Sequence, residues 1–153
     1  MVTYNSIKFF DPTFIEAGKW LFWENQLNSL KNIIMHTWAK IVISSSWRRN
    51  MMDKVRDEFY LAEEKTWFNF WSHVISQTPD SLWYWRWNEI LSWIDRHHAT
   101  CWVWDHITHW VAIDDNDHDM KCIKRLWRFV HTRVWDWLTK EKFCEVMLIL
   151  WQK

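Results

Sequence analysis

The stretch SLWYWRW, residues 81–87, fits the pattern of a strand and also that of a helix. The fold class depends on which of the two it forms. Trp83, Trp85 and Trp87 alternate with other residues, and alternation at period two is typical of a half-buried strand. Trp83 and Trp87 alone lie four residues apart, which places them on one face of a helix. On a helix they fall near Ile90, while Trp85 points to the opposite side. The three- and four-residue spacing of the apolar residues that follow favours the helix.

The length and amino-acid composition of the chain limit the folds that it can adopt. The 153 residues are enough for one ordinary domain with a sizeable buried core. Average usage would give about 11 glycines and about 8 prolines in this length, whereas the chain has 1 and 2, together with 17 tryptophans. Few positions can therefore adopt positive φ without strain. This argues against hairpin-rich all-β folds and against glycine-rich phosphate loops.

Charge and hydropathy exclude several classes of partner. The 19 basic and 19 acidic side chains cancel, so no overall field attracts nucleic acid or an anionic membrane. The longest apolar run, VMLILW at 146–151, is too short to span a bilayer, and the N-terminal residues lack a signal-peptide pattern. The three cysteines form no CxxC pair and are predicted to be reduced. We expect a soluble protein, cytoplasmic if expressed in a cell, with no nucleic-acid or membrane partner.

Apolar residues recur at three- and four-residue steps along most of the chain, which is the pattern of amphipathic helices. Serines at 44–46, the Thr-Pro-Asp sequence at 78–80 and the acidic loop at 114–119 interrupt this pattern. The sequence therefore predicts four helices, at about residues 12–44, 47–77, 80–113 and 119–152. Four long helices with short connections predict a single all-α domain over residues 1–153, an up-down-up-down four-helix bundle.

Histidine is the residue type with the clearest functional potential, because four of the eight lie in the third predicted helix. His97 falls on the buried side of that helix, and Glu63 stands at a similar height on the second helix. One hypothesis is that these two ligate haem or a metal. His98, Asp105 and His109 share one flank of the third helix and form a candidate Zn²⁺ or Ni²⁺ site. The simpler interpretation of His97 is a hydrogen-bonded core histidine, so no cofactor and no metal is predicted.

A second apolar strip lies on the outer side of the third predicted helix. It consists of Trp85, Val103 and Trp110. Contiguous exposed apolar residues commonly mark a contact surface, so self-association or protein binding through this strip is the functional interpretation. Imperfect surface patterning is the alternative.

No catalytic motif accompanies these features. The chain has no HExxH, no GxSxG and no cysteine–histidine zinc spacing. Near-equal helices, one glycine and balanced charge make the chain resemble a computationally designed helical bundle rather than a member of a natural family. This resemblance implies a structural scaffold with no evolved function that is not an enzyme. The alternatives are the binding module just described and a metal- or haem-binding bundle.

Overall fold

The computed structural model describes residues 24–44, 51–80, 85–115, 118–133 and 138–151. Within these ranges the α-helices are α1 (Glu24–Thr37), α2 (Met52–Thr66), α3 (Arg86–Thr100), α4 (Lys121–Arg125) and α5 (Lys140–Trp151). The strands are β1 (Ile41–Ile43), β2 (Val74–Gln77), β3 (Ala112–Asp114) and β4 (Phe129–His131). Three short 3-10 helices complete the described elements: η2 (Trp71–His73), η3 (Val103–Asp105) and η4 (His118–Met120).

The strands form two parallel pairs. β1 pairs with β2, with Ile41 opposite Val74 and an irregularity before Val42. β3 pairs with β4 in uninterrupted register, with Asp114 opposite His131. Parallel strands need a long crossover connection, and here α2 connects β1 to β2 while α4 lies between β3 and β4.

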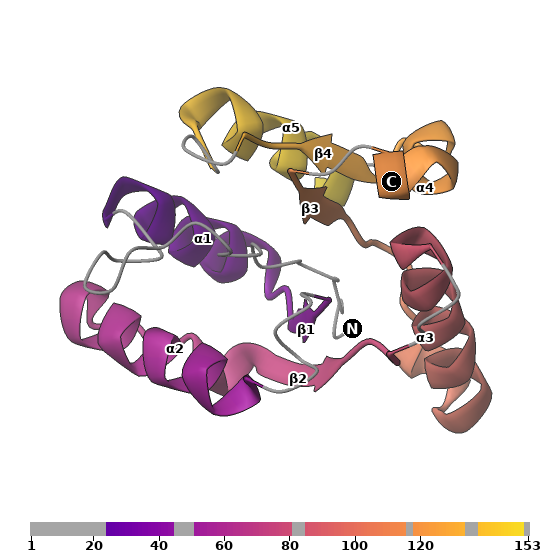
Figure 1. Ribbon diagram of the computed structural model, residues 1–153, viewed down its shortest axis with the longest axis horizontal. Helices are drawn as coiled ribbons and strands as arrows, with labels where there is room; N and C mark the ends of the chain where they lie inside the picture. Colours follow the sequence, from indigo (N-terminus) through magenta and orange to yellow (C-terminus); the bar gives the residue numbers. More distant parts are fainter. Residues whose placement is uncertain (1–23, 45–50, 81–84, 116–117, 134–137, 152–153) are drawn as a thin grey trace.

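Helices cover both faces of these strands. Ile41 and Ile43 of β1 and Ile113 of β3 belong to one apolar core, which they share with α1, α2 and α5. The residues between them in sequence, Val42 and Ala112, belong to a second core, which they share with α3, α4 and η4. Strands buried on both faces are typical of parallel sheets in α/β proteins. In Figure 1, α1 and α2 accordingly lie on one side of β1 and α3 lies on the other.

The prediction of an all-α bundle with helices of about thirty residues is therefore wrong. The four longer helices have 14, 15, 15 and 12 residues. The first two predicted helices each contain a shorter helix and a strand, the third contains α3 and most of β3, and the fourth contains α4, β4 and α5. The error arises because a short strand buried on both faces reads as a continuous apolar run, and such a run satisfies a helical periodicity as well. Ile41, at the end of the first predicted helix, lies in β1 rather than on a helical face.

The tryptophan-rich stretch at residues 81–87 becomes helical at Arg86. Arg86 and Trp87 begin α3, and Trp85 is its N-cap residue. Trp87 packs against the second core, whereas Trp85 is 52% exposed. The helical interpretation of this stretch is therefore confirmed for Arg86 and Trp87. Trp85 is extended just before the helix, and Trp83 lies outside the described residues.

No helix among the described residues is long and apolar enough to cross a membrane.

Tryptophan occupies positions that usually belong to glycine at three helix ends. Trp38 follows α1, Trp67 follows α2 and Trp127 follows α4, and each has φ of 55°. The Trp67 N–H donates to the Glu63 carbonyl at 2.8 Å, so it closes the helix in the left-handed conformation. This conformation costs an L-residue with a Cβ about 1–2 kcal/mol, whereas glycine adopts it freely.

We expect Trp67→Gly to stabilise the protein by about 1 kcal/mol, because backbone strain is relieved and little packing is lost. Trp67 is 92% exposed. Thermal unfolding should show a rise of about 2–4 °C for a domain of this size. Trp102→Gly is the matched control, since Trp102 is also exposed but has φ of −68°. An equal gain in both variants would mean that loss of an exposed indole, rather than relief of strain, stabilises the chain.

Candidate functional site

A buried polar residue stands at the carboxyl end of each strand. These residues are Ser44 after β1, Thr78 after β2, Asp114 at the end of β3 and Thr132 after β4, and each is at most 2% exposed. The strand pairs continue into them through backbone hydrogen bonds. The Thr78 N–H donates to the Ile43 carbonyl and the Thr132 N–H to the Asp114 carbonyl, each at 2.8 Å. Ligands of α/β proteins commonly bind outside the carboxyl ends of parallel strands, so these ends are the first place to seek a site.

The end of the β1–β2 pair carries two hydroxyl groups. The Thr78 Oγ1 hydroxyl donates to Ser44 Oγ at 3.2 Å, and both residues are buried. This hydrogen bond satisfies buried hydroxyl groups that would otherwise lose their interactions with water.

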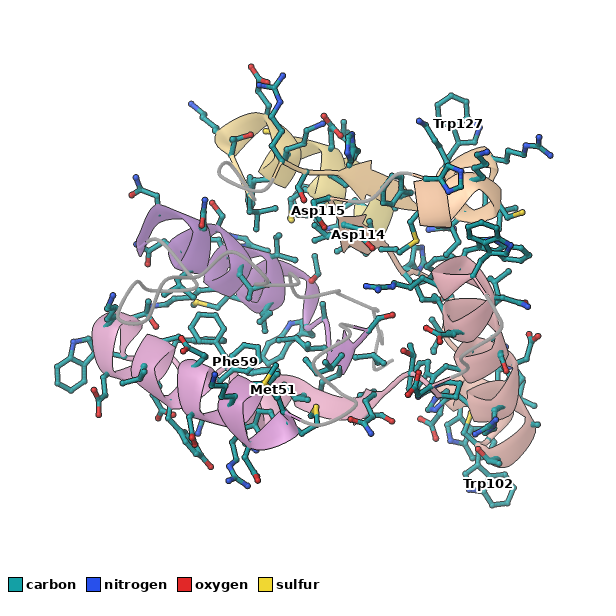
Figure 2. All side chains as sticks on the ribbon, viewed as in Figure 1. Met51, Phe59, Trp102, Asp114, Asp115 and Trp127 are labelled. Carbon is teal, nitrogen blue, oxygen red and sulfur yellow. The ribbon has the colours of Figure 1, made fainter. Side chains whose placement is uncertain are left out.

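The end of the β3–β4 pair carries two consecutive carboxylates, Asp114 and Asp115. Asp114 is 2% exposed, and Asp115 is half-buried. Figure 2 shows both at the end of β3, where that strand lies beside β4. Asp115 is connected to β4 as well, because His131 Nε2 lies 3.0 Å from the Asp115 carbonyl oxygen.

A buried carboxylate is costly unless other groups compensate for the lost hydration. Departures of this kind from the apolar pattern are expected at functional sites. The Thr132 Oγ1 atom beside Asp114 is also buried, and it has no hydrogen-bond partner among the described residues. This end of the β3–β4 pair is therefore the candidate functional site.

The carboxylates limit the chemistry that the site can perform. Among the described residues, no group of three or more His, Cys, Asp or Glu side chains could hold a metal ion. Zinc and calcium sites formed by protein ligands alone normally need at least three such donors. Mg²⁺ differs, since it keeps several waters and binds through one or two carboxylates together with substrate phosphates. Asp114 and Asp115 supply two carboxylates at this strand end, and they are the residues that would hold such an ion.

The residues proposed for a haem or metal site in a bundle lie on different parts of the fold. Glu63 is on α2, where its carbonyl accepts the N–H that closes the helix. His97 is on α3, where its ring stacks on Trp93 at 5.3 Å between centroids. α2 contributes to the first core and α3 to the second. The bundle that would have brought Glu63 and His97 to the same height is absent from the described fold.

The residues proposed for a Zn²⁺ or Ni²⁺ site do not share one helix. His98 lies in the last turn of α3, Asp105 in η3 and His109 in the segment before β3. His98 Nε2 accepts the Ile107 N–H at 2.9 Å, and His109 Nδ1 lies 2.8 Å from Thr108 Oγ1. Because α3 ends at Thr100, the flank that the three residues would share on a longer helix does not form.

The predicted outer strip is also divided among separate elements. Trp85 lies at the start of α3 and its ring is 5.3 Å from that of His118. Val103 is in η3 and is 76% exposed, whereas Trp110 packs against the second core. The indoles of Trp102 and Trp104, on either side of Val103, stack at 5.2 Å and are also exposed.

His98 connects the end of α3 to the segment that leads into β3. Its ring stacks on that of His106 at 4.5 Å, and acceptance of the Ile107 N–H requires a neutral Nε2 atom. The pKa of His98 lies below its ordinary value of 6.5, chiefly because of burial and then because of nearby His106 and His97; Asp95 opposes the shift. The neutral ring is therefore the form that stabilises this connection.

We expect the free energy of unfolding to fall as the pH falls below about 6.5, because the unfolded chain then binds a proton at His98 more readily than the folded chain. The free energy of unfolding should stop falling once the pH is below the pKa of His98 in the folded protein. His73 acts in the same direction, since burial and Lys40 lower its pKa. Glu58 acts in the opposite direction at lower pH, because burial raises its pKa.

The difference between wild type and His98→Gln isolates the contribution of His98, since glutamine can accept the same N–H and does not titrate. Urea unfolding at about pH 7.5 and about pH 5.5 should show a smaller loss of stability in the variant. An identical loss in both proteins would contradict the prediction.

The comparison with known families identifies the chain. A sequence profile described as "HAD domain in Swiss Army Knife RNA repair proteins" matches residues 2–143. The chain belongs to this family. No curated protein and no solved structure gives a significant match.

Membership of this HAD family corrects three predictions. The resemblance to an artificial bundle is wrong, because the match extends over most of the chain. The tryptophan excess is a property of composition, whereas family membership is carried by the order of residues along the chain. The interpretation as an inert designed scaffold is wrong as well, because the family match supports a natural HAD-like function related to RNA repair. The prediction that the chain is not an enzyme is also wrong, because HAD domains are typically hydrolases or phosphatases.

Sequence reasoning missed Asp114 and Asp115 as site residues because it treated them as the acidic start of a loop. The signal that could have found them is the run WVAIDD at 110–115, in which an apolar segment ends directly in two carboxylates. This is the pattern of a buried parallel strand whose carboxyl end carries functional side chains. The run IVIS at 41–44 shows the same pattern with a hydroxyl residue.

Proposed function

We propose that the chain is a HAD-type phosphate-ester hydrolase that removes a terminal phosphate from RNA. The single observation that carries this proposal is the position of Asp114 and Asp115 at the carboxyl end of β3 in a chain of this HAD family. Hydrolysis of a phosphate ester needs groups that position the phosphate and groups that manage its charge. Two carboxylates can hold Mg²⁺, which neutralises charge on the phosphate, or can accept a proton from attacking water.

The expectation that nucleic acid is not a partner rested on the cancelled net charge of the whole chain. Cancelled net charge argues against a broad basic surface, but it does not exclude a small site that binds the end of one strand. The proposal therefore concerns a terminal phosphate rather than an extended RNA duplex.

The direct test measures release of inorganic phosphate from short RNA oligonucleotides that carry either a 5′- or a 3′-phosphate. The assay is run with Mg²⁺ and again with a chelator. We expect release from one of the two ends, with little release in the chelator. The same oligonucleotides without the terminal phosphate serve as the blank. Absence of release from both ends in the presence of Mg²⁺ would refute the proposal.

A further inference from the structure

A pocket lies between the carboxyl end of β4 and the first turn of α5. Its volume is about 390 Å³ and its described lining residues are His131, Arg133, Thr139, Glu141 and Lys142. This volume lies within the range of about 300–1,000 Å³ that is usual for small-ligand sites. The pocket adjoins the candidate site, because His131 also contacts the Asp115 carbonyl oxygen at 3.0 Å.

The charged groups of the pocket favour an anion. Arg133 is exposed and lines the pocket, so it contributes a permanent positive charge to this volume. Lys142 Nζ contacts Glu145 Oε1 at 2.8 Å, in a pair whose side chains are 29% and 47% exposed. Exposed pairs of this kind are weak, so they yield readily to a more highly charged partner. Glu141 is the acidic residue among the described lining and opposes anion binding.

The start of α5 adds to this preference. The Thr139 Oγ1 atom accepts the Lys142 N–H at 3.3 Å, and the Thr139 carbonyl accepts the Phe143 N–H at 2.8 Å, so Thr139 caps the helix. α5 has 12 residues, and the N-terminus of a helix carries a partial positive charge. That charge acts together with Arg133 on the same volume.

We propose that this pocket binds a phosphate group of the substrate other than the one that is removed. This inference rests on the proposed function, and it assigns the pocket the role of holding the adjacent phosphate in the RNA backbone. Arg133 is the principal ligand, because a guanidinium matches two phosphate oxygens with two parallel hydrogen bonds. Lys142 contributes a point charge, and the terminal phosphate lies toward Asp115.

Equilibrium binding, measured without catalysis, tests the pocket separately from the hydrolase proposal. The probes are inorganic phosphate, the RNA dinucleotide pUpU with a 5′-phosphate, and UpU without it. Titrations at about 0.15 M salt suppress weak non-specific attraction. We expect Arg133→Ala to weaken binding of pUpU about tenfold, the effect of losing one bidentate charged contact.

Two further variants distinguish binding in the pocket from attraction by the overall charge of the protein. Glu141→Gln should strengthen binding a few-fold, since it removes the acidic group that repels the ligand. Arg125→Ala, an exposed basic residue on α4 outside the pocket, should leave binding unchanged. If inorganic phosphate competes with pUpU and loses affinity in Arg133→Ala, the pocket recognises an isolated phosphate. If only the dinucleotides bind and both lose affinity in Arg133→Ala, it recognises the phosphodiester.

Equal losses in Arg133→Ala and Arg125→Ala would overturn the proposal, because binding would then follow overall charge. Absence of binding by all three probes would also overturn it. The outcomes remain distinguishable from those of the hydrolase assay. Binding that depends on Arg133 without phosphate release contradicts the proposed function alone, whereas release without such binding contradicts the pocket alone. Circular dichroism of each variant checks that the fold is retained.

Discussion

Asp115→Asn is expected to reduce the rate of phosphate release at least about 100-fold, the usual effect of losing a group that transfers a proton or stabilises charge in the transition state. Asparagine has nearly the same shape as aspartate, but it carries no negative charge and cannot act as a base. Asp115 is the better choice than Asp114 because it is half-buried, whereas Asp114 is 2% exposed. Replacement of a buried carboxylate would mix effects on folding with effects on activity.

The measurement is the initial rate of phosphate release under saturating oligonucleotide, together with the thermal unfolding temperature of each protein. Asp53→Asn is the matched control. Asp53 is a carboxylate on the first turn of α2, with a side chain 86% exposed, and it pairs with Arg56 at 2.9 Å. Its replacement should leave the rate within about twofold, since exposed ion pairs contribute little. Comparable loss in both variants, or an unchanged rate in Asp115→Asn, would remove Asp115 from the site.

Phe59→Ala is expected to lower the free energy of unfolding by about 3–5 kcal/mol, the usual range for truncating a buried phenylalanine. Phe59 lies on α2 and is 1% exposed. Its ring is 6.1 Å from that of Phe70 and 6.0 Å from that of Trp71, so three aromatic rings meet beneath the helix. Figure 2 shows Phe59 pointing from α2 toward α1, where α2 and α1 pack together. Truncation leaves a cavity that neighbouring rings cannot fill without moving.

Tyr60→Ala is the control for Phe59→Ala, because it removes an aromatic side chain from the next position of the same helix. Tyr60 is 46% exposed, so its loss should cost less than about 1 kcal/mol. Urea unfolding of the three proteins measures the difference directly. The total stability of a domain is commonly about 5–15 kcal/mol, so Phe59→Ala is expected to approach the limit of folding. Similar costs for the two variants would contradict the placement of Phe59 in the core.

Clean apolar stripes mark the segments that form α2 and α3, although both predicted helices extended too far. Val55, Phe59 and Ala62 have the spacing of one helical face, and they are buried on α2. Trp87, Ile90 and Ile94 have the same three- and four-residue spacing, and they pack in the second core with α3. In both cases the information lies within four residues along the chain, so the local pattern is sufficient.

The strands could not be predicted in this way. Ile41–Ile43 is only three residues long, too short for its apolar run to be distinguished from the end of a helix. Hydrogen bonds to distant residues make it a strand. The Ser44–Thr78 contact at the end of the β1–β2 pair joins residues 34 apart in sequence. The end of α2 at Thr66 is not marked in the sequence either, since helix ends commonly carry glycine and here the following position carries tryptophan.

Prediction of the candidate site also required knowledge of which distant segments pair. Asp114 and Asp115 were described only as part of an acidic loop, whereas their proposed role depends on β3 being a strand whose carboxyl end adjoins β4. Arg133 and Lys142 were not predicted as site residues, because nothing in their sequence spacing indicates that they line one pocket. His97 and His98 were proposed as ligands because histidine titrates near neutral pH and commonly binds metals. This is a property of the residue type, and it carries no information about the neighbours of these residues in the fold.

The sequence by itself determined the amphipathic segments that became α2 and α3 and the absence of glycine-rich phosphate loops, because these depend on residue type and on spacings of a few positions. The order of residues over 2–143 also determined the family. Only the tertiary structure decided which apolar runs pair as parallel strands, which carboxylates lie at a strand end and which cations share a pocket. Parallel pairing joins segments separated by a whole crossover helix, and no local pattern records the partner of a strand.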